Sequence, residues 1–259
     1  MTRDPCPSMA EASVVELRQY TLRPGCRETL VELFERELIE PQQAVGMRVG
    51  GVFCDRRDPD RFVWFRGFAD LPARHRALTG FYSGPVWREH GSAANATMLD
   101  TDDVLLLRPT APARPVADPA PPPADEREWV VVSVYEHLAD EELTRWLTVD
   151  VQPLLEDALG VPVGAWRTEP ARNTVPSLPV RDGANAFVWT ATFADETHYR
   201  GAWAGLLARD DWRRLVAPRL TAALTAHQHL DLRPTPRSAH PALARRAAAA
   251  PATTERTRP

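Results

Sequence analysis

The segment HQHLDLRP near the end of the chain places three titratable side chains, His227, His229 and Asp231, on alternate residues. If the segment is a strand, these side chains share one face of a sheet, because successive strand residues point to opposite faces. His229 and Asp231 would then lie about 6 to 7 Å apart. A histidine titrates near neutral pH, so a histidine with a carboxylate and a phenol can accept and return protons. We therefore predict His229 and Asp231 as catalytic residues.

The two histidines of this segment also allow a metal site, in which Asp231 would be a third ligand. The sequence offers no firm further ligand, and the three cysteines show neither metal nor redox spacing. Fingerprints of nucleotide-binding loops, serine-hydrolase turns and paired cysteines do not occur. We therefore expect no metal, haem or flavin, and proton transfer is the leading chemistry.

The elements that position these residues come from an internal repeat. Residues 62–70, FVWFRGFAD, return at 187–195 as FVWTATFAD, an offset of 125 residues. Tyr20 corresponds to Tyr135 at the shorter offset of 115, and an insertion rich in Pro, Asn and Gly at 170–185 explains the difference. The chain is therefore read as a tandem duplication.

Both copies predict the same order of elements from their alternating and helical periodicities. The order is strand, helix, strand, strand, helix, strand, which is the βαββαβ pattern of ferredoxin-like folds. In the first copy the segments are 13–22, 26–39, 47–55, 62–70, 72–98 and 103–109. In the second copy they are 129–138, 141–159, 161–169, 187–195, 196–226 and 229–234.

Two domains follow from this pattern, at residues 13–109 and 128–235. Residues 110–127 are rich in Pro and Ala and are expected to be an extended linker, and residues 236–259 are expected to be a disordered tail. One βαββαβ unit covers one face of its sheet with helices and leaves the other face bare. We therefore expect an α+β protein, in which two ferredoxin-like domains pack sheet to sheet as an intramolecular barrel.

The segments VVELRQYTLRPGCRETLVELFE and FVWFRGFADLPARHRAL, with Trp87 after them, resemble the NIPSNAP family of the dimeric α/β-barrel superfamily. The resemblance covers residues 14–109, and residues 129–234 are a more divergent copy with Tyr199 at the place of Arg74. It implies a barrel that this chain completes by duplication instead of dimerisation. It implies no single activity, because proteins with this barrel include cofactor-free monooxygenases, cyclases, isomerases, haem-binding enzymes and stress-response proteins.

Strand alternation sorts the side chains of each sheet into two faces. Val130, Val132 and Val134 form an apolar stripe that we assign to the helices, so the residues between them would face the barrel interior. Applied to both halves, this assignment places a polar and aromatic set inside the barrel, with Tyr135 as a catalytic hydrogen-bond donor. The predicted substrate-binding residues are Glu16, Arg18, Tyr20, Trp64, Arg66, Ser133, His137 and Trp189.

Simpler interpretations exist for the same residues. Glu16, Arg18 and Arg66 are expected to form an internal ion pair, and a carboxylate-binding site is the alternative. The aromatic residues would fill the barrel without touching a ligand, and His229 with Asp231 would be a solvated pair at the barrel mouth.

The composition excludes several classes of protein. The net charge of −4 comes without runs of like charge, so we expect no nucleic-acid or acidic-lipid partner. The chain has no lysine, which excludes Schiff-base chemistry. No segment reaches the ~18 consecutive apolar residues of a membrane span, and the first residues lack the apolar core of a signal peptide. We expect a cytoplasmic protein, either a monomeric pseudo-dimer or a homodimer of it.

These inferences lead to a cofactor-independent acid/base enzyme, of cyclase, isomerase or lyase type. Its substrate would be a hydrophobic, aromatic or polyketide-like metabolite of secondary metabolism, bound inside the barrel. A cofactor-free monooxygenase with the same barrel is one alternative. A non-enzymatic barrel that binds small molecules or is purely structural is the other.

Overall fold

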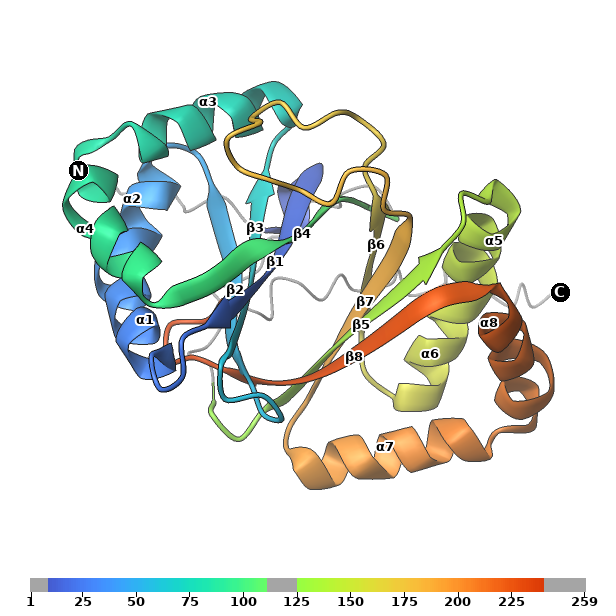
Figure 1. Cartoon of the computed structure of the whole chain (residues 1–259). Coiled ribbons are helices and arrows are strands. Elements are labelled where there is room, and N and C mark those ends of the chain that lie inside the picture. Colours follow the sequence, from blue (N-terminus) through green and yellow to red (C-terminus); the bar gives the residue numbers. More distant parts are fainter. Residues whose placement is uncertain (1–8, 111–124, 240–259) are drawn as a thin grey trace, which may run out of the picture.

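The computed structural model describes residues 9–110 and 125–239, and both halves have the predicted βαββαβ order (Figure 1). The first half contains β1 (Val14–Leu22), α1 (Arg27–Leu33), α2 (Ile39–Ala44), β2 (Arg48–Asp55), β3 (Arg61–Phe68), α3 (Leu71–Tyr82), α4 (Pro85–Ala96) and β4 (Met98–Pro109). The second half contains β5 (Trp129–His137), α5 (Glu141–Trp146), α6 (Gln152–Leu159), β6 (Val163–Thr168), β7 (Ala186–Phe193), α7 (Glu196–Ala208), α8 (Ala217–Ala223) and β8 (Leu224–Pro234). A π-helical turn, at Phe34–Leu38 and at Leu147–Val151, joins α1 to α2 and α5 to α6 into continuous helices, and another at Trp212–Val216 leads into α8.

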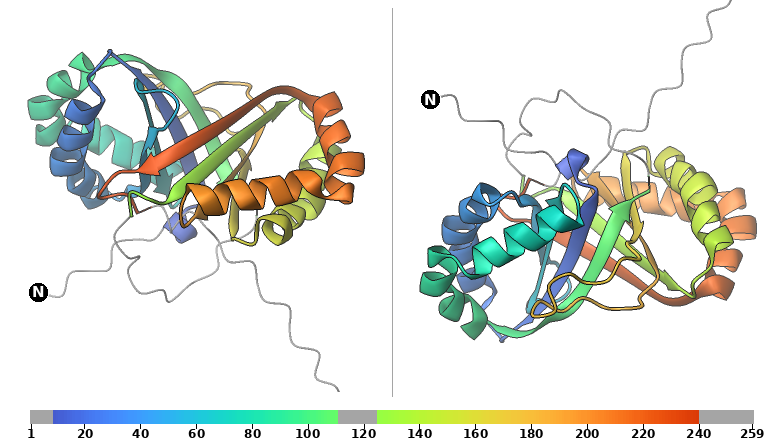
Figure 2. Two further views of the ribbon diagram at one scale, coloured as in Figure 1. Left: turned by 90° about the horizontal axis from the view of Figure 1, so that it is seen from below. Right: turned by 90° about the horizontal axis from the view of Figure 1, so that it is seen from above.

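The strands of the two halves close into one antiparallel barrel in the order β1-β3-β2-β8-β5-β7-β6-β4. The halves meet at two seams, where β2 pairs with β8 and β4 pairs with β6. The helices of the two halves lie on opposite sides of the barrel (Figure 2). The predicted intramolecular barrel is therefore confirmed.

The repeated FAD tripeptide ends a strand and begins a helix in both halves. Asp70 caps α3 by accepting a hydrogen bond from the Ala73 N–H at 2.6 Å, and Asp195 caps α7 by accepting one from the His198 N–H at 2.8 Å. An aspartate at this position satisfies one of the N–H groups that a helix start leaves without a partner. The two halves thus share the same residues at the turn from strand to helix, where the aspartate caps the helix.

The predicted assignment of the two sheet faces is wrong: the structure inverts it. The buried cluster that spans both halves, and therefore fills the barrel, contains Val130, Val132 and Val134 together with residues such as Leu17 and Phe65. An eight-stranded barrel has an interior just wide enough for side chains, so compact branched and aromatic residues fill it. Alternation alone separates the two faces without telling which one meets the helices. The polar and aromatic set lies on the helix side.

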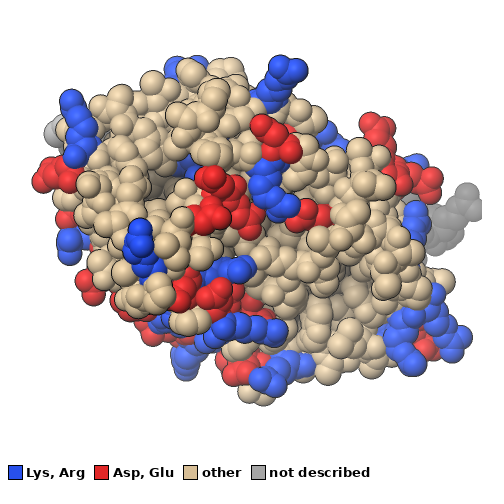
Figure 3. Space-filling view, viewed as in Figure 1, with Lys and Arg blue, Asp and Glu red and all other residues tan. Residues whose placement is uncertain are grey.

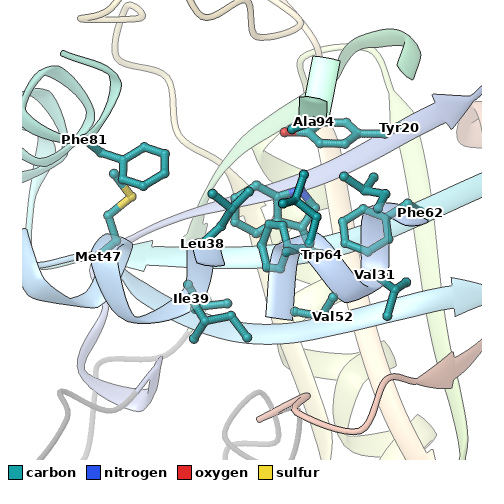
Figure 4. Packing of buried hydrophobic residues seen from close by; sticks show 14 of the residues in the cluster. Tyr20, Val31, Leu38, Ile39, Met47, Val52, Phe62, Trp64, Phe81 and Ala94 are labelled. Atoms are coloured by element: carbon teal, nitrogen blue, oxygen red, sulfur yellow. The ribbon is translucent and has the colours of Figure 1, made fainter. Parts of the chain in front are cut away.

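Two further buried clusters occupy the spaces between each half-sheet and its helices. In the first half, Trp64 and Phe62 pack against helix residues such as Leu38 (Figure 4). In the second half, Trp189 and Phe187 take the equivalent positions against α5, α6 and α7. The aromatic residues that the sequence singled out therefore belong to the helix–sheet layers.

Each half also sends one loop across a seam to the other half. The loop after β2 places the Arg56 guanidinium 4.4 Å from the Trp129 ring centroid, and the Arg57 guanidinium contacts the Asp231 carboxylate. The longer loop 169–185, between β6 and β7, reaches the first half, where Val175 and Leu178 pack on the apolar cluster. Loop 169–185 contains the predicted insertion, and Figure 1 shows it beside α3. Each helix–sheet layer is thus completed by a loop of the other half.

The predicted linker and tail lie almost entirely outside the described residues, at 111–124 and 240–259. The first residues of the predicted tail are described and contact the first half: the Ser238 hydroxyl accepts a hydrogen bond from the Val52 N–H at 3.0 Å, and the Arg237 guanidinium contacts Glu40. The tail prediction is therefore corrected for these residues. None of the helices within 9–110 and 125–239 has the length and hydropathy to cross a membrane.

Candidate functional site

The candidate site lies in the helix–sheet layer of the second half and is centred on His229 of β8. Ser133 is its register partner on β5, and the Ser133 hydroxyl lies 3.0 Å from His229 Nδ1. The Tyr199 hydroxyl, from α7, lies 3.1 Å from the other ring nitrogen, Nε2. The His229 side chain is 17% exposed, so solvent reaches the ring. A partly exposed imidazole is thus held at both nitrogens by hydroxyl groups.

Asp231 lies beside His229 as predicted, with its Oδ1 at 3.6 Å from His229 Nε2. The same oxygen accepts a hydrogen bond from the indole N–H of Trp129 at 2.9 Å. Burial raises the pKa of the Asp231 carboxyl, but its contact with His229, the Trp129 bond and the charge of Arg57 outweigh burial, so the pKa lies below its usual value. Asp231 is therefore ionised at neutral pH and stabilises a positive charge on the imidazole.

Tyr199 and the aromatic residues around it were not predicted as part of the site. The Tyr199 ring stacks on Trp129 at 5.3 Å, and Trp203 lies 4.9 Å from the His229 ring. Burial, followed by the nearby Asp231 charge, raises the pKa of Tyr199 to about 12, so it is a neutral phenol at physiological pH. The exchange of Arg74 for Tyr199 between the repeats was the sequence signal that pointed to this residue.

Tyr135 contacts His227 and not His229. It is fully buried, and its ring lies 4.9 Å from His227 and packs near Phe187 and Trp189. Burial raises the pKa of Tyr135 to about 12. The phenol next to His229 in the structure is that of Tyr199, whereas the predicted hydrogen-bond donor Tyr135 lies beside His227 in the apolar layer.

His227, His137 and Trp189 occupy the edges of the same layer. The His227 ring is exposed, and its Nε2 lies 3.3 Å from the Ser133 hydroxyl; burial and the charge of His229 lower its pKa. His137 is buried at the end of β5, with Nδ1 2.6 Å from the Leu138 carbonyl oxygen. Trp189 is buried with its ring 6.5 Å from His229. Ser133, Trp189 and His229 are thus brought together, and His137 binds backbone instead.

The predicted first-half residues form a separate cluster on the opposite side of the barrel. Glu16 is paired with Arg18 and Arg66, as the ion-pair interpretation expected, and also with Arg74 of α3. Tyr20 and Trp64 lie in the same layer. The barrel interior separates this cluster from His229, so the predicted residues form two sites and not one.

The possible metal pair has no complete ligand set. The His227 and His229 rings are 6.3 Å apart, and both approach the Ser133 hydroxyl. Within residues 9–110 and 125–239, no three His, Cys, Asp or Glu side chains gather as a metal site requires. Figure 3 shows acidic and basic side chains side by side across the middle of one face of the molecule.

Comparisons with known proteins agree with this architecture. The barrel is similar to a monooxygenase-like protein of Fusobacterium nucleatum, with 8% identity and a TM-score of 0.57 over 86% of this chain and 92% of that one. It is also similar to a monooxygenase-like protein of Lactobacillus acidophilus, with 11% identity and a TM-score of 0.54 over 88% of this chain and 97% of that one. An anthrone oxidase-like protein gives 13% identity and a TM-score of 0.53 over 90% and 96% of the two chains. At these identities the likeness concerns the fold.

None of the curated proteins matches the sequence. The NIPSNAP family model matches residues 15–114, which cover β1 from its second residue, β2 to β4 and α1 to α4. Residues 15–114 therefore resemble the NIPSNAP family, and the second half completes this part of the chain into a closed eight-stranded α/β barrel.

Proposed function

We propose that the protein is a cofactor-independent acid/base enzyme that uses His229 to remove a proton from a flat hydrophobic metabolite. The observation that supports this most directly is the set of contacts around His229. The ring is partly exposed, both of its nitrogens lie at hydrogen-bond distance from a hydroxyl, and a buried carboxylate lies beside it. A histidine fixed in this way is pre-oriented for proton transfer, because its ring need not reorganise during the reaction.

The roles of the neighbours follow from their charges. Nε2 of His229 is the base, and the ionised Asp231 stabilises the imidazolium that forms when Nε2 takes the proton. Tyr199 remains a phenol, and its O–H, which faces the base nitrogen Nε2 at 3.1 Å in the free site, turns to the oxyanion that the substrate develops when Nε2 takes the proton. Ser133 Oγ, at Nδ1, keeps the ring from rotating. The site thus contains a base, a charge partner and an oxyanion donor.

The side chains around His229 support a proposal for the substrate class. Trp129, Trp189 and Trp203 surround His229 and Tyr199 with aromatic faces. Such faces bind flat apolar ligands, with a few polar groups that fix the orientation. We therefore infer an aromatic or polyketide-like ketone or phenol with an acidic C–H group, bound between sheet and helices and not inside the barrel.

Oxygen chemistry is the second candidate function, and the fold of the similar solved structures favours it. The carbanion that His229 generates on the substrate has three courses. Reprotonation at another carbon gives isomerisation, attack on a carbonyl carbon of the same molecule followed by protonation of the alkoxide gives cyclisation, and reaction with O₂ gives oxidation. With anthrone as substrate, oxidation converts a CH₂ group and O₂ into a C=O group and water, with no external reductant. A non-enzymatic binding protein would support none of these courses.

Anthrone is a suitable probe, because deprotonation and oxidation can be measured separately. Without O₂, exchange of its acidic C–H hydrogens in D₂O, followed by NMR, reports proton transfer. With O₂, an oxygen electrode reports consumption. We expect His229→Gln to lower the rate of hydrogen exchange or of O₂ consumption, whichever the native chain catalyses, by ~10²- to 10⁴-fold, the usual loss for a general base. His198→Gln, on the exposed face of α7, is the matched control. Binding without exchange or oxidation would contradict the enzyme proposal and leave a binding protein.

A further inference from the structure

The first half contains a buried excess of positive charge. Glu16 Oε1 accepts a hydrogen bond from Arg74 Nε at 2.6 Å, and Glu16 Oε2 accepts bonds from Arg66 Nε at 2.7 Å and Arg18 Nη1 at 2.6 Å. All four side chains are at most 3% exposed. One carboxylate is therefore shared by three guanidinium groups, which leaves a formal charge of +2 out of contact with solvent.

The hydroxyl groups next to these arginines do not neutralise them. The Tyr20 hydroxyl accepts a hydrogen bond from Arg18 Nε at 2.8 Å, and burial raises the pKa of Tyr20, so it is a neutral phenol. The Tyr82 hydroxyl lies 3.4 Å from Arg66 Nη1. An unbalanced buried charge costs several kcal/mol, because the protein interior solvates it less well than water. The cluster therefore favours an anion.

Three N–H donors of the same cluster lack an acceptor. They are Trp64 Nε1, Arg66 Nη2 and Arg74 Nη2, which are buried and have no hydrogen-bond partner within the described part of the chain. Buried donors in native proteins are almost always paired, and each unpaired one costs about 1 to 3 kcal/mol. Two of the three carry positive charge. The unpaired donors therefore favour a bound anion, as the excess positive charge also does.

Loop 169–185 of the other half covers the cluster. Arg74 Nη1 donates to Asn173 Oδ1 at 3.0 Å and lies 3.3 Å from the Thr174 hydroxyl. A groove of about 1590 Å³ runs between this loop and α5, and both Asn173 and Leu106 line it. Leu106 is the register partner of Glu16 across β1 and β4. The groove therefore reaches two neighbours of the charged cluster, the hydrogen-bond partner of Arg74 and the register partner of Glu16.

We propose that this cluster binds a small flat organic carboxylate, which enters from the groove beneath loop 169–185. The carboxylate oxygens accept hydrogen bonds from the free guanidinium nitrogens of Arg66 and Arg74. A flat body suits these surroundings because the aromatic rings of Trp64 and Tyr82 lie next to Arg66, with their centroids 5.1 and 5.9 Å from its guanidinium carbon. This site is separate from His229 and does not depend on the proposed reaction.

Calorimetric titration with sodium benzoate, sodium acetate and inorganic phosphate tests the ligand class. We expect saturable binding of benzoate, at least tenfold tighter than acetate or phosphate, because only benzoate provides both the carboxylate and the flat ring. Arg74→Gln and Arg66→Gln should each weaken benzoate binding at least tenfold. Arg200→Gln, an exposed arginine of α7, should leave it unchanged. The proposal fails if benzoate does not bind, or if Arg74→Gln binds it as the native chain does.

A loop variant provides a test that does not alter the buried cluster. Asn173→Ala with Thr174→Ala removes the two side-chain contacts between the loop and Arg74 and keeps the contact of the Thr174 carbonyl oxygen with His75 Nδ1. Stopped-flow tryptophan fluorescence should show benzoate associating at least threefold faster, because the loop opens more readily. An association rate equal to that of the native chain would contradict entry beneath loop 169–185.

Discussion

Arg74 and Tyr199 occupy the same position in the two halves, four residues after the aspartates that cap α3 and α7, and both reach from helix to sheet. Arg74 Nε donates to Glu16 at 2.6 Å, and the Tyr199 hydroxyl lies 3.1 Å from His229 Nε2. One half thus presents a guanidinium to a buried carboxylate, and the other presents a phenol to an imidazole. The repeated frame is shared, and the difference between the halves lies in these helix-to-sheet contacts.

Tyr199→Phe tests the role of the phenol. The phenylalanine ring keeps the stacking on Trp129 and removes only the hydroxyl next to His229. We expect kcat for anthrone exchange or oxidation to fall by about 10²- to 10³-fold, the range for one lost oxyanion donor, while KM changes little. Kinetics at varied substrate concentration measure the two constants separately. A change in KM alone would show that Tyr199 only shapes the site.

Glu16→Gln tests the electrostatics of the first half. Burial raises the pKa of Glu16, but the charges of Arg66, Arg18 and Arg74 outweigh burial and hold it well below its usual range. Because the folded-state pKa is lowered, Glu16 contributes stability above its usual pKa of about 4 and loses it as the pH falls toward the folded-state value. Removing one partner of a buried ion pair costs about 3 to 5 kcal/mol.

The expected result for Glu16→Gln is therefore a lower free energy of unfolding at pH 7 and a weaker loss of stability between pH 4 and pH 2. Urea unfolding at a series of pH values measures both. Glu32→Gln, on the exposed face of α1, is the control for a change of net charge alone. Acid unfolding as steep in Glu16→Gln as in the native chain would show that another group dominates.

The sequence predicted the fold well and the faces of the sheets badly. Repeats, periodicities and capping aspartates define the elements, because these signals are local. Val130 and Val131 are both fully buried, one inside the barrel and the other under the helices. When both faces of a sheet are buried, alternation does not tell which face meets the helices and which lines the barrel. The polar residues were therefore predicted inside the barrel, on the wrong face. His229 and Asp231 were found because their types stand out in a strand, while Trp129 and Arg57 reach the site through tertiary contacts alone.

Phe65 and Trp166 test the corrected barrel interior. They come from different halves, and their rings lie 5.8 Å apart within the cluster that fills the barrel. Phe65→Ala should destabilise the protein by about 3 to 5 kcal/mol. In a double-mutant cycle, Phe65→Leu and Trp166→Phe should show a coupling energy of about 0.5 kcal/mol or more. Phe65→Leu with Trp189→Phe, which lies in a helix layer, should be additive. Equal coupling energies for the two pairs would contradict the placement of Phe65 and Trp166 inside the barrel and of Trp189 under the helices.

The isolated first half should not be a stable monomer. Residues 1–110 would expose the apolar face of β1 to β4, including Leu17, Phe65 and Leu105, which the second half covers in the intact barrel. A contiguous exposed apolar face of this kind drives association. Light scattering coupled to gel filtration should therefore show dimers or larger species. Cutting the intact chain near Pro121 should instead leave the two halves together, because both barrel seams and both crossing loops remain. A well-folded monomer of residues 1–110 would contradict the view that the second half exists to close the barrel.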